Sequence, residues 1–367
     1  MSTGRPATVV VTGAMGQVGQ RVCGYLLERG RTVVALDLDS PATREVAADL
    51  ERAQGPGRLA PVFADLTDAD AVRRAFDEHQ PDGIVHLAAI VSPVCYQRPD
   101  LARKVNVEGT RNLVRAAATL DHRPGFVYAS SSAVYGPRNP YRHRDRITPQ
   151  TPVDPCDCYG AHKVESEQII ADSGLPHAVL RLGGILSPEA LNPGNASDYL
   201  LFVGAIPRDG RLHMVDARDV ALAFANAVDR IDAVDGKVLL IGGDESFVNL
   251  QGTVQDELFA ALGLGRLGGR GQLPGDPEDD RSWSFTDWFD TSESQALLDY
   301  QQHHWAETVD WIRSSQGIKR RLIQAAGPIG RPVLVGYLNH LHRRAGGGEY
   351  SRPWDRIAEA YGKEVLT

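Results

Sequence analysis

The segment Thr12–Gly19, with the sequence TGAMGQVG, constrains this chain more than any other feature. A glycine stands at every third position, directly after the apolar run Val9–Val11 and directly before a helical pattern over residues 16–29. Glycine lets the backbone turn tightly, and it lets a helix N-terminus approach a phosphate group closely. This context predicts a strand–turn–helix unit that binds the pyrophosphate of a dinucleotide. A tight connection without a ligand is the alternative.

An acidic residue follows the next predicted strand, Thr32–Leu36. This residue, Asp37, comes 18 residues after Gly19. A carboxylate at this place can accept hydrogen bonds from both ribose hydroxyls of NAD, and it repels the 2′-phosphate of NADP. The next arginine after Asp37 is Arg44, so no arginine follows at once to receive that phosphate. The sequence therefore favours NAD as the cofactor.

Short β-branched runs alternate with helical stretches through the first half of the chain. Such alternation predicts a parallel sheet covered on both faces, so the expected fold class is α/β with a doubly wound parallel sheet. Further strands are expected at 61–64, 83–87 and 126–129, and a helix at 101–120. Later elements are a strand entering a helix at 213–228, a strand at 237–241, a helix at 247–263, and loops at 187–212 and 264–281.

Composition limits the partners that the chain can have. The net charge is −8, which disfavours a nucleic-acid binder because such proteins are normally basic. No apolar run approaches the ~18 residues of a membrane span, and the N-terminus does not resemble a signal peptide. Four cysteines are too few for a disulfide scaffold, and Cys156 and Cys158 lack the second pair of a zinc site. We expect a cytoplasmic protein with a small-molecule substrate and no metal.

The segment 316–344 differs from the rest of the chain because it is purely basic. It contains no Asp or Glu, and its cations are Lys319, Arg320, Arg321, Arg331, Arg343 and Arg344. Gly327-Pro328 and Arg331-Pro332 interrupt it, so one long helix is not expected. The tail 316–367 is expected to pack on the acidic body of its own chain or on a second subunit. The more specific alternative is that the tail contacts a membrane surface or another anionic partner.

Tyr159 and Lys163 are four residues apart, which places both side chains on one face of a helix. A phenol, with a pKa of about 10, is a poor base at neutral pH, but a nearby ammonium and the positive nicotinamide of bound NAD both favour the phenolate. Tyr159 can then take the proton of a substrate hydroxyl while hydride leaves the same carbon. If this pair stood alone in the sequence, the more common explanation would be a Tyr and a Lys on a helix surface that have no catalytic role.

Several motifs, in their order along the chain, resemble the extended short-chain dehydrogenase/reductases, also called the NAD-dependent epimerase/dehydratase family. Besides the glycine turn and Tyr-x-x-x-Lys, they are Asp65-Leu66, HLAA at 86–89, VNVEGT at 105–110, VYASSSAVYG at 127–136 and HMVDARDVA at 213–221. The resemblance runs from about Thr8 to Ile312. It implies a Rossmann-like doubly wound parallel sheet with a smaller C-terminal substrate lobe.

The resemblance also implies roles for individual residues. Ser131 aligns with the catalytic hydroxyl that orients the substrate oxygen beside Tyr159, and Lys163 also holds the nicotinamide ribose. Candidate substrate contacts are Ser132, Arg208 and Arg211, although the arginines fit surface charges or ion pairs about equally well. The expected NAD-binding residues are Gly13, Met15, Gly16, Gln17, Val18, Asp37, Asp65, Leu66, Leu87, Ala88, Ala89, Asn106, Ala129, Tyr159 and Lys163.

Two features of the resemblance narrow the chemistry. Family dehydratases carry Asp-Glu after the hydroxyl residue, and family decarboxylases carry Glu at the second of these positions. This chain has Ser132 and Ala133 there, so both reactions are disfavoured. Sugar-nucleotide enzymes of the family have an Asn three residues after the arginine that is Arg181 here, and it contacts the diphosphate. This chain has Gly184 at that position, which weakens a sugar-nucleotide assignment.

We therefore expect an NAD-binding Rossmann domain from residues 1–183 and 211–243, a substrate lobe from 184–210 and 244–315, and the basic tail. The hypothesis is hydride transfer at a secondary alcohol carbon of a sugar, sugar nucleotide or sugar-like metabolite. The enzyme would be an epimerase that retains NAD or a dehydrogenase that releases NADH. A ketoreductase of a non-nucleotide metabolite and a non-catalytic NAD-binding regulator are the alternatives. A homodimer is common in the family that the chain resembles.

Overall fold

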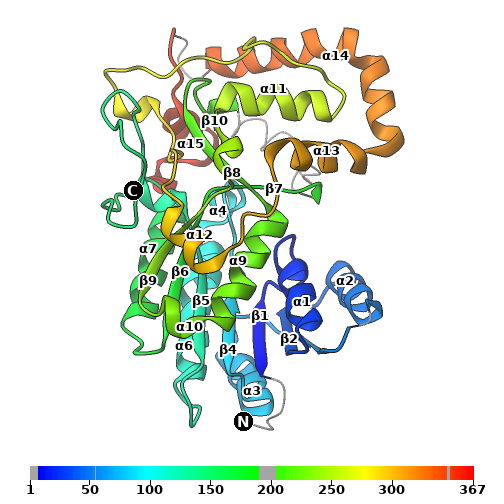
Figure 1. Ribbon diagram of the computed structural model, residues 1–367. Helices are drawn as coiled ribbons and strands as arrows, with labels where there is room; N and C mark the ends of the chain where they lie inside the picture. The colour runs from blue at the N-terminus through cyan, green and yellow to red at the C-terminus, as the bar shows by residue number, and fades with distance from the viewer. Residues whose placement is uncertain (1–6, 54, 190–203, 345–347) are drawn as a thin grey trace.

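A seven-stranded parallel sheet forms the centre of the computed structural model, which describes residues 7–53, 55–189, 204–344 and 348–367 (Figure 1). Its strand order is β3-β2-β1-β4-β5-β6-β9, so the chain steps outward from β1 and then continues on the other side of it. This doubly wound topology confirms the expected fold class. The strands are β1 (Thr8–Thr12), β2 (Thr32–Asp37), β3 (Arg58–Phe63), β4 (Gly83–His86), β5 (Gly125–Ser131), β6 (His177–Leu182) and β9 (Lys237–Ile241).

Helices cover both faces of the sheet because successive strand residues point to opposite sides. Val9 and Val11 of β1 are buried with α1 (Gly19–Glu28) and α9 (Ala217–Asp229). Val10 is buried instead with the helices of the other face. The further helices of this part are α2 (Pro41–Arg52), α3 (Ala69–His79), α4 (Val94–Gln97), α5 (Pro99–Arg103), α6 (Gly109–Ala117), α7 (Cys158–Ala171), α10 (Ile231–Val234) and α12 (Ser292–Leu298). A π-helical turn over Lys104–Glu108 lies within the expected helix 101–120.

A second sheet has three strands in the order β10-β8-β7. These strands are β7 (Gly184–Leu186), β8 (Arg211–Asp216) and β10 (Val248–Leu250), and they share a core with α11 (Gln251–Ala261) and α13 (Trp305–Ser315). The helix expected at 247–263 therefore begins later, after a short strand. Residues 190–203 of the loop expected at 187–212 lie outside the described residues, and its last two residues belong instead to β8. The loop expected at 264–281 contains neither a helix nor a strand as far as residue 279, but its last two residues begin a short 3-10 helix, Asp280–Ser282.

The tail contradicts one expectation, because helix α14 runs from Gly317 to Arg344 through Pro328 and Pro332. A proline removes one backbone N–H and displaces the carbonyl four residues earlier, which can bend a helix without ending it. The two prolines are four residues apart and fall on one side of the helix, and α14 changes direction along its length in Figure 1. Leu338 anchors the second part, since it is buried with Phe259 of α11.

After α14 the chain returns to the side of the large sheet. There it forms α15 (Pro353–Tyr361) and a short 3-10 helix, η6 (Lys363–Val365). Trp354 of α15 is buried in one cluster with Tyr159. This part of the tail therefore packs on its own chain, which is one of the expected positions. No helix among the described residues has the length and apolar character needed to cross a membrane.

Candidate active site

A cavity of about 520 Å³ lies beyond the carboxyl ends of β1, β2, β3 and β4, where the strand order reverses. Open parallel sheets bind their ligands at such a point. Nine of the residues predicted to bind NAD line the cavity, namely Gly13, Met15, Gly16, Asp37, Asp65, Leu66, Leu87, Ala88 and Ala89. The sequence reasoning missed Leu36, Leu38, Thr43, Ala64, Ile90, Leu101 and Val105. Most of these residues are neighbours in sequence of a predicted cofactor-binding motif. Their place at or just after the end of a predicted strand could therefore have identified them as cavity residues.

The glycine turn has the geometry that a pyrophosphate requires. Gly13 has a positive φ of 64°, and a Cβ there would come within 2.9 Å of the Ala88 backbone nitrogen. A Cβ on Gly19 would lie only 2.1 Å from the Gly13 carbonyl oxygen. No side chain caps the start of α1, so the positive end of its dipole is available to an anion. The turn therefore fits a dinucleotide.

The carboxylate of Asp37 is held at the cavity wall by backbone groups. Its Oδ2 accepts a hydrogen bond from Met15 N at 2.8 Å, and its Oδ1 accepts one from Leu38 N at 2.8 Å. Arg44 is engaged elsewhere, because its Nε donates to Asp39 Oδ1 at 2.6 Å. A fixed negative charge with no free arginine beside it fits the ribose of NAD and disfavours the additional phosphate of NADP.

Six of the predicted cofactor residues lie outside the lining of this cavity, namely Tyr159 and Lys163, which are described below, and four others. Asn106 supports it from behind, since its side chain bonds both the N–H of Ile90 (2.7 Å) and the carbonyl of Ile90 (3.0 Å). Gln17 accepts a hydrogen bond from Ser187 at 2.6 Å, and Val18 is buried at the start of α1. The carbonyl of Ala129 accepts a hydrogen bond from Lys163. Direct contacts between these four residues and the cofactor stay predictions.

The three predicted catalytic side chains come together at the end of β5 and the start of α7. Ser131 is the last residue of β5, and its hydroxyl is hydrogen-bonded to the phenol of Tyr159. Lys163 lies one turn further along α7, with its Nζ 5.6 Å from the centroid of the Tyr159 ring. Its Nζ donates to the Ala129 carbonyl at 2.6 Å, which fixes the ammonium group. Sequence positions 131, 159 and 163 thus form one spatial group.

Burial shifts both titratable groups of this site toward their neutral forms. It raises the pKa of the Tyr159 phenol, and the hydrogen bond from Ser131 acts in the opposite direction. Burial also lowers the pKa of Lys163 to about 7, against the attraction of Glu167. The phenol is therefore harder to deprotonate than that of an exposed tyrosine, whereas the ammonium of Lys163 loses its proton more readily than that of an exposed lysine. Groups with such shifts are typical of acid–base catalysis.

Asp157 fixes the start of the catalytic helix, and the sequence reasoning did not single it out. Its carboxylate caps α7 by accepting a hydrogen bond from Gly160 N at 2.7 Å, and it also accepts one from the Tyr96 hydroxyl. Burial raises the pKa of Asp157 to about 6, and both hydrogen bonds oppose that rise. An Asp directly before a helical run is a common helix cap, and this was the signal that could have revealed it.

The predicted substrate contacts are placed differently from one another. Ser132 is buried in η2 (Ser132–Tyr135), the 3-10 helix directly after β5. Arg208 lines a separate hollow of about 310 Å³, and Arg211 donates to the His143 carbonyl at 3.0 Å while lying over the Trp288 ring. Neither arginine lines the cavity of the predicted NAD residues. Their substrate roles stay predictions.

A fold and a site of this kind define a class of enzymes that use a dinucleotide to oxidise or reduce a carbon bearing oxygen. The chain belongs to the NAD-dependent epimerase/dehydratase family, whose model matches residues 9–242. This confirms the family that the motifs resemble. NAD is therefore its cofactor, in agreement with the environment of Asp37.

Curated relatives and solved structures agree with this membership. D-erythronate dehydrogenase of Cupriavidus necator is 32% identical over 169 residues, which span 45% of this chain and about half (49%) of that protein. An uncharacterized epimerase/dehydratase of Staphylococcus aureus is 26% identical over 65% of this chain and 71% of its own length. The UDP-glucose-4-epimerase of Stenotrophomonas maltophila, solved with NAD, has a TM-score of 0.66 and 22% identity, covering 84% of this chain and 99% of its own. The UDP-Glc/GlcNAc 4-epimerase of Campylobacter jejuni has a TM-score of 0.67 and 19% identity, and the match covers 86% of this chain and 99% of that one.

Proposed function

We propose that the protein is an NAD-dependent dehydrogenase acting on a secondary alcohol of a sugar-like metabolite that carries no nucleotide. The observation that carries this proposal is the group formed by Ser131, Tyr159 and Lys163 beside the dinucleotide cavity. These residues supply what oxidation of an alcohol needs from the protein: a proton acceptor, a group that orients the oxygen, and a cation that stabilises the phenolate. Similarity to a dehydrogenase of a four-carbon sugar acid supports the substrate class.

In the proposed mechanism, Tyr159 takes the proton of the substrate hydroxyl at its phenol oxygen. Ser131, which already bonds this phenol, holds the substrate oxygen beside it. The ammonium of Lys163 stabilises the phenolate, and its bond to the Ala129 carbonyl keeps it in place. When bound, NAD accepts hydride from the substrate carbon or returns it. In the opposite direction, Tyr159 gives its proton back to the new hydroxyl.

The surroundings of Gly184 support a substrate without a diphosphate. This glycine stands where the sugar-nucleotide enzymes of the family carry an asparagine. A Cβ on Gly184 would lie 2.3 Å from the Met214 sulfur and 2.9 Å from its Cε. An amide side chain at this position would therefore require the end of the Met214 side chain to move. The chain therefore has no asparagine at this position to contact a diphosphate, and the Met214 side chain occupies the space in which one would stand.

Epimerisation is the second candidate function, and the family name with its UDP-sugar epimerase neighbours in fold favours it. The same three residues would hold the substrate oxygen and exchange its proton, while hydride would come back from the reduced cofactor to the opposite face of the transient ketone. Such a cycle must not lose its reduced cofactor, whereas a dehydrogenase must release it. The retention of NAD by the purified protein therefore distinguishes the two reactions.

The test begins with the nucleotide content of the purified protein and continues with NADH absorbance against sugar acids and polyols. We expect little retained NAD, NADH formation with one of these substrates, and a loss of turnover of about 1,000-fold or more in Tyr159→Phe with NAD binding preserved. Tyr25→Phe, a half-buried tyrosine of α1, is the matched control. NAD retained near one per chain, with inversion of a sugar nucleotide, would establish the epimerase. Unchanged function in Tyr159→Phe would establish a non-catalytic NAD-binding regulator.

Two further expectations belong to the proposal. We propose that the protein works in the cytoplasm as a homodimer, and that its NAD-binding domain comprises residues 1–183 and 211–243. Light scattering of the purified protein tests the dimer. A monomeric mass at all concentrations would refute it.

A further inference from the structure

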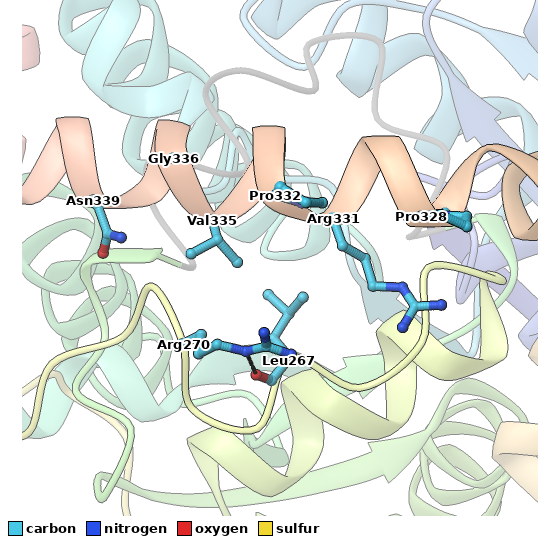
Figure 2. A pocket seen from close by; sticks show the side chains of 9 residues that line it. Leu267, Arg270, Pro328, Arg331, Pro332, Val335, Gly336 and Asn339 are labelled. Atoms are coloured by element: carbon cyan, nitrogen blue, oxygen red, sulfur yellow. Dashed lines mark hydrogen bonds between the residues drawn. The ribbon is translucent and has the colours of Figure 1, made fainter.

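A second cavity, of about 580 Å³, lies between α14 and the loop that follows α11. Figure 2 shows the helix and this loop on opposite sides of the gap, each contributing side chains. Its walls combine four apolar side chains, Leu267, Pro328, Pro332 and Val335, with two arginines, Arg270 and Arg331. The volume falls in the range of small-molecule sites. This cavity shares no residue with the NAD cavity.

Neither arginine of this cavity pairs with an acidic residue among those that the structure describes. Arg331 Nε is buried and has no hydrogen-bond partner. Its guanidinium lies beside two glycines, since a Cβ at Gly265 or Gly327 would come within 3.1 Å or 3.4 Å of it. Arg270 Nε donates to the Leu267 carbonyl at 2.9 Å. Across the described part of the chain, neither arginine has a carboxylate within ion-pair distance, so both remain available to an anion.

Helix α14 also exposes large apolar side chains that do not line this cavity. Ile318, Leu322, Val333 and Tyr337 are exposed by 75%, 66%, 67% and 38%. Ile318 and Leu322 lie before the two prolines and Val333 and Tyr337 lie after them, and the members of each pair share one side of the helix because they are four residues apart. The segment 316–344 contains no acidic residue, although the chain as a whole has a net charge of −8. A basic helix with exposed apolar residues is typical of helices that lie in the headgroup region of a membrane.

We propose that α14 docks on an anionic lipid surface and that its cavity receives the phosphate-bearing headgroup of an acidic lipid. Arg270 and Arg331 would bind the phosphate, and the apolar walls would contact the adjoining hydrocarbon. A soluble anion would account for the arginines alone. A lipid surface accounts for the arginines, the apolar walls and the exposed apolar side chains together. The docking is peripheral and does not depend on the proposed reaction.

The test is sedimentation of the full chain with vesicles of phosphatidylcholine alone or mixed with phosphatidylglycerol. We expect binding only to the mixed vesicles, and a loss of about tenfold in affinity for Arg331→Gln or Arg270→Gln. Arg331→Lys keeps the charge but not the two-pronged geometry, so it should also bind more weakly. Arg321→Gln, on the same helix and outside the cavity, is the matched control and should lose less. NAD binding by every variant verifies its fold.

Three results would overturn the proposal. The first is an absence of binding to the mixed vesicles by the full chain. The second is binding in which Arg331→Lys equals the unaltered protein, because diffuse charge would then suffice without a site. The third is a dimer that Val333→Ser with Tyr337→Ser converts to monomers while vesicle binding persists. In that case the exposed face of α14 would be covered by a second copy of the chain.

Discussion

The sheet of the NAD-binding part and the C-terminal region from residue 264 onward are stabilised in different ways. In the sheet, neighbouring strands share continuous ladders, and each strand is buried by helices that are mostly close in sequence. The C-terminal region instead attaches through single large side chains, such as Trp354, which is buried in one cluster with Tyr159 of α7. The comparison suggests that cofactor binding and completion of the catalytic site are separable.

The strongest test of this separation changes the glycine turn. Gly19→Ala should reduce NAD affinity by more than about 100-fold, because its Cβ would lie 2.1 Å from the Gly13 carbonyl oxygen and must displace the turn. The C-terminal region should keep its protection from hydrogen exchange. Gly24→Ala lies in the same helix with no atom within 4 Å of its new Cβ, so it should bind NAD normally. Normal NAD affinity in Gly19→Ala would contradict the role of the turn.

The reciprocal test removes an anchor of the C-terminal region. Trp354 is 2% exposed, and Trp354→Ala should cost about 3–5 kcal/mol in the stability of its segment. Hydrogen exchange of residues 353–367 should accelerate and turnover should fall, while calorimetry finds NAD affinity unchanged. Tyr350→Ala, at a position 40% exposed, is the control. An equal loss of NAD affinity would mean that the two regions are one cooperative unit.

A smaller effect is expected for the charge that selects the cofactor. Asp37→Asn should weaken NAD binding by about tenfold, because it removes the charged acceptor for the ribose hydroxyls. It should also reduce the preference for NAD over NADP, since the repulsion of the 2′-phosphate disappears. Binding titrations with both nucleotides measure this, with the exposed Asp49→Asn as a control of equal charge. An unchanged preference would remove Asp37 from the selection of the cofactor.

The smallest expected effect is on the free energy of unfolding at acidic pH, through His213, which contacts Phe289 of the C-terminal region. His213 accepts a hydrogen bond from Phe289 N (3.1 Å) and donates to the Gly243 carbonyl (2.9 Å), so it is neutral. Burial lowers its pKa to about 4 from 6.5. Between these values the unfolded chain binds more protons, so stability falls as the pH falls, by up to roughly 1.4 kcal/mol per pH unit.

His213→Gln should therefore make the free energy of unfolding less dependent on pH. Denaturant titrations at pH 7 and pH 5 measure the difference. His122→Gln, at a side chain 40% exposed, should leave the dependence as it is. Burial also lowers the pKa of His86 to about 3, so part of the acid sensitivity should remain. If the free energy of unfolding of His213→Gln depended on pH as strongly as that of the unaltered protein, the acid sensitivity would come entirely from other groups such as His86.

The sequence predicted the sheet well because its determinants are local. Apolar runs, glycine turns and helical periodicity each act over a few residues, and they located the strands of the NAD-binding part. The error at α14 has a physical cause. Pro328 and Pro332 weaken a helix locally, but they lie on one side of it, and the burial of Leu338 holds the helix beyond them.

The candidate site divides in the same way. Motifs predicted the residues at the strand ends, and the structure brings Ser131, Tyr159 and Lys163 together. No motif could show that Asp157 would lie beside Tyr96 or form a β-bridge with Leu366, 209 residues further along the chain. Such contacts depend on how the C-terminal region folds back, and no local pattern encodes them.

The β-bridge between Asp157 and Leu366 has a consequence for the order in which this protein matures. A ribosome delivers the N-terminal part first, and that part can begin to fold while synthesis continues. The NAD-binding sheet is then complete before the residues that enclose the start of the catalytic helix have been made. NAD can stabilise this unfinished form by binding to it. The growing chain therefore acquires its cofactor site well before it acquires a finished catalytic centre.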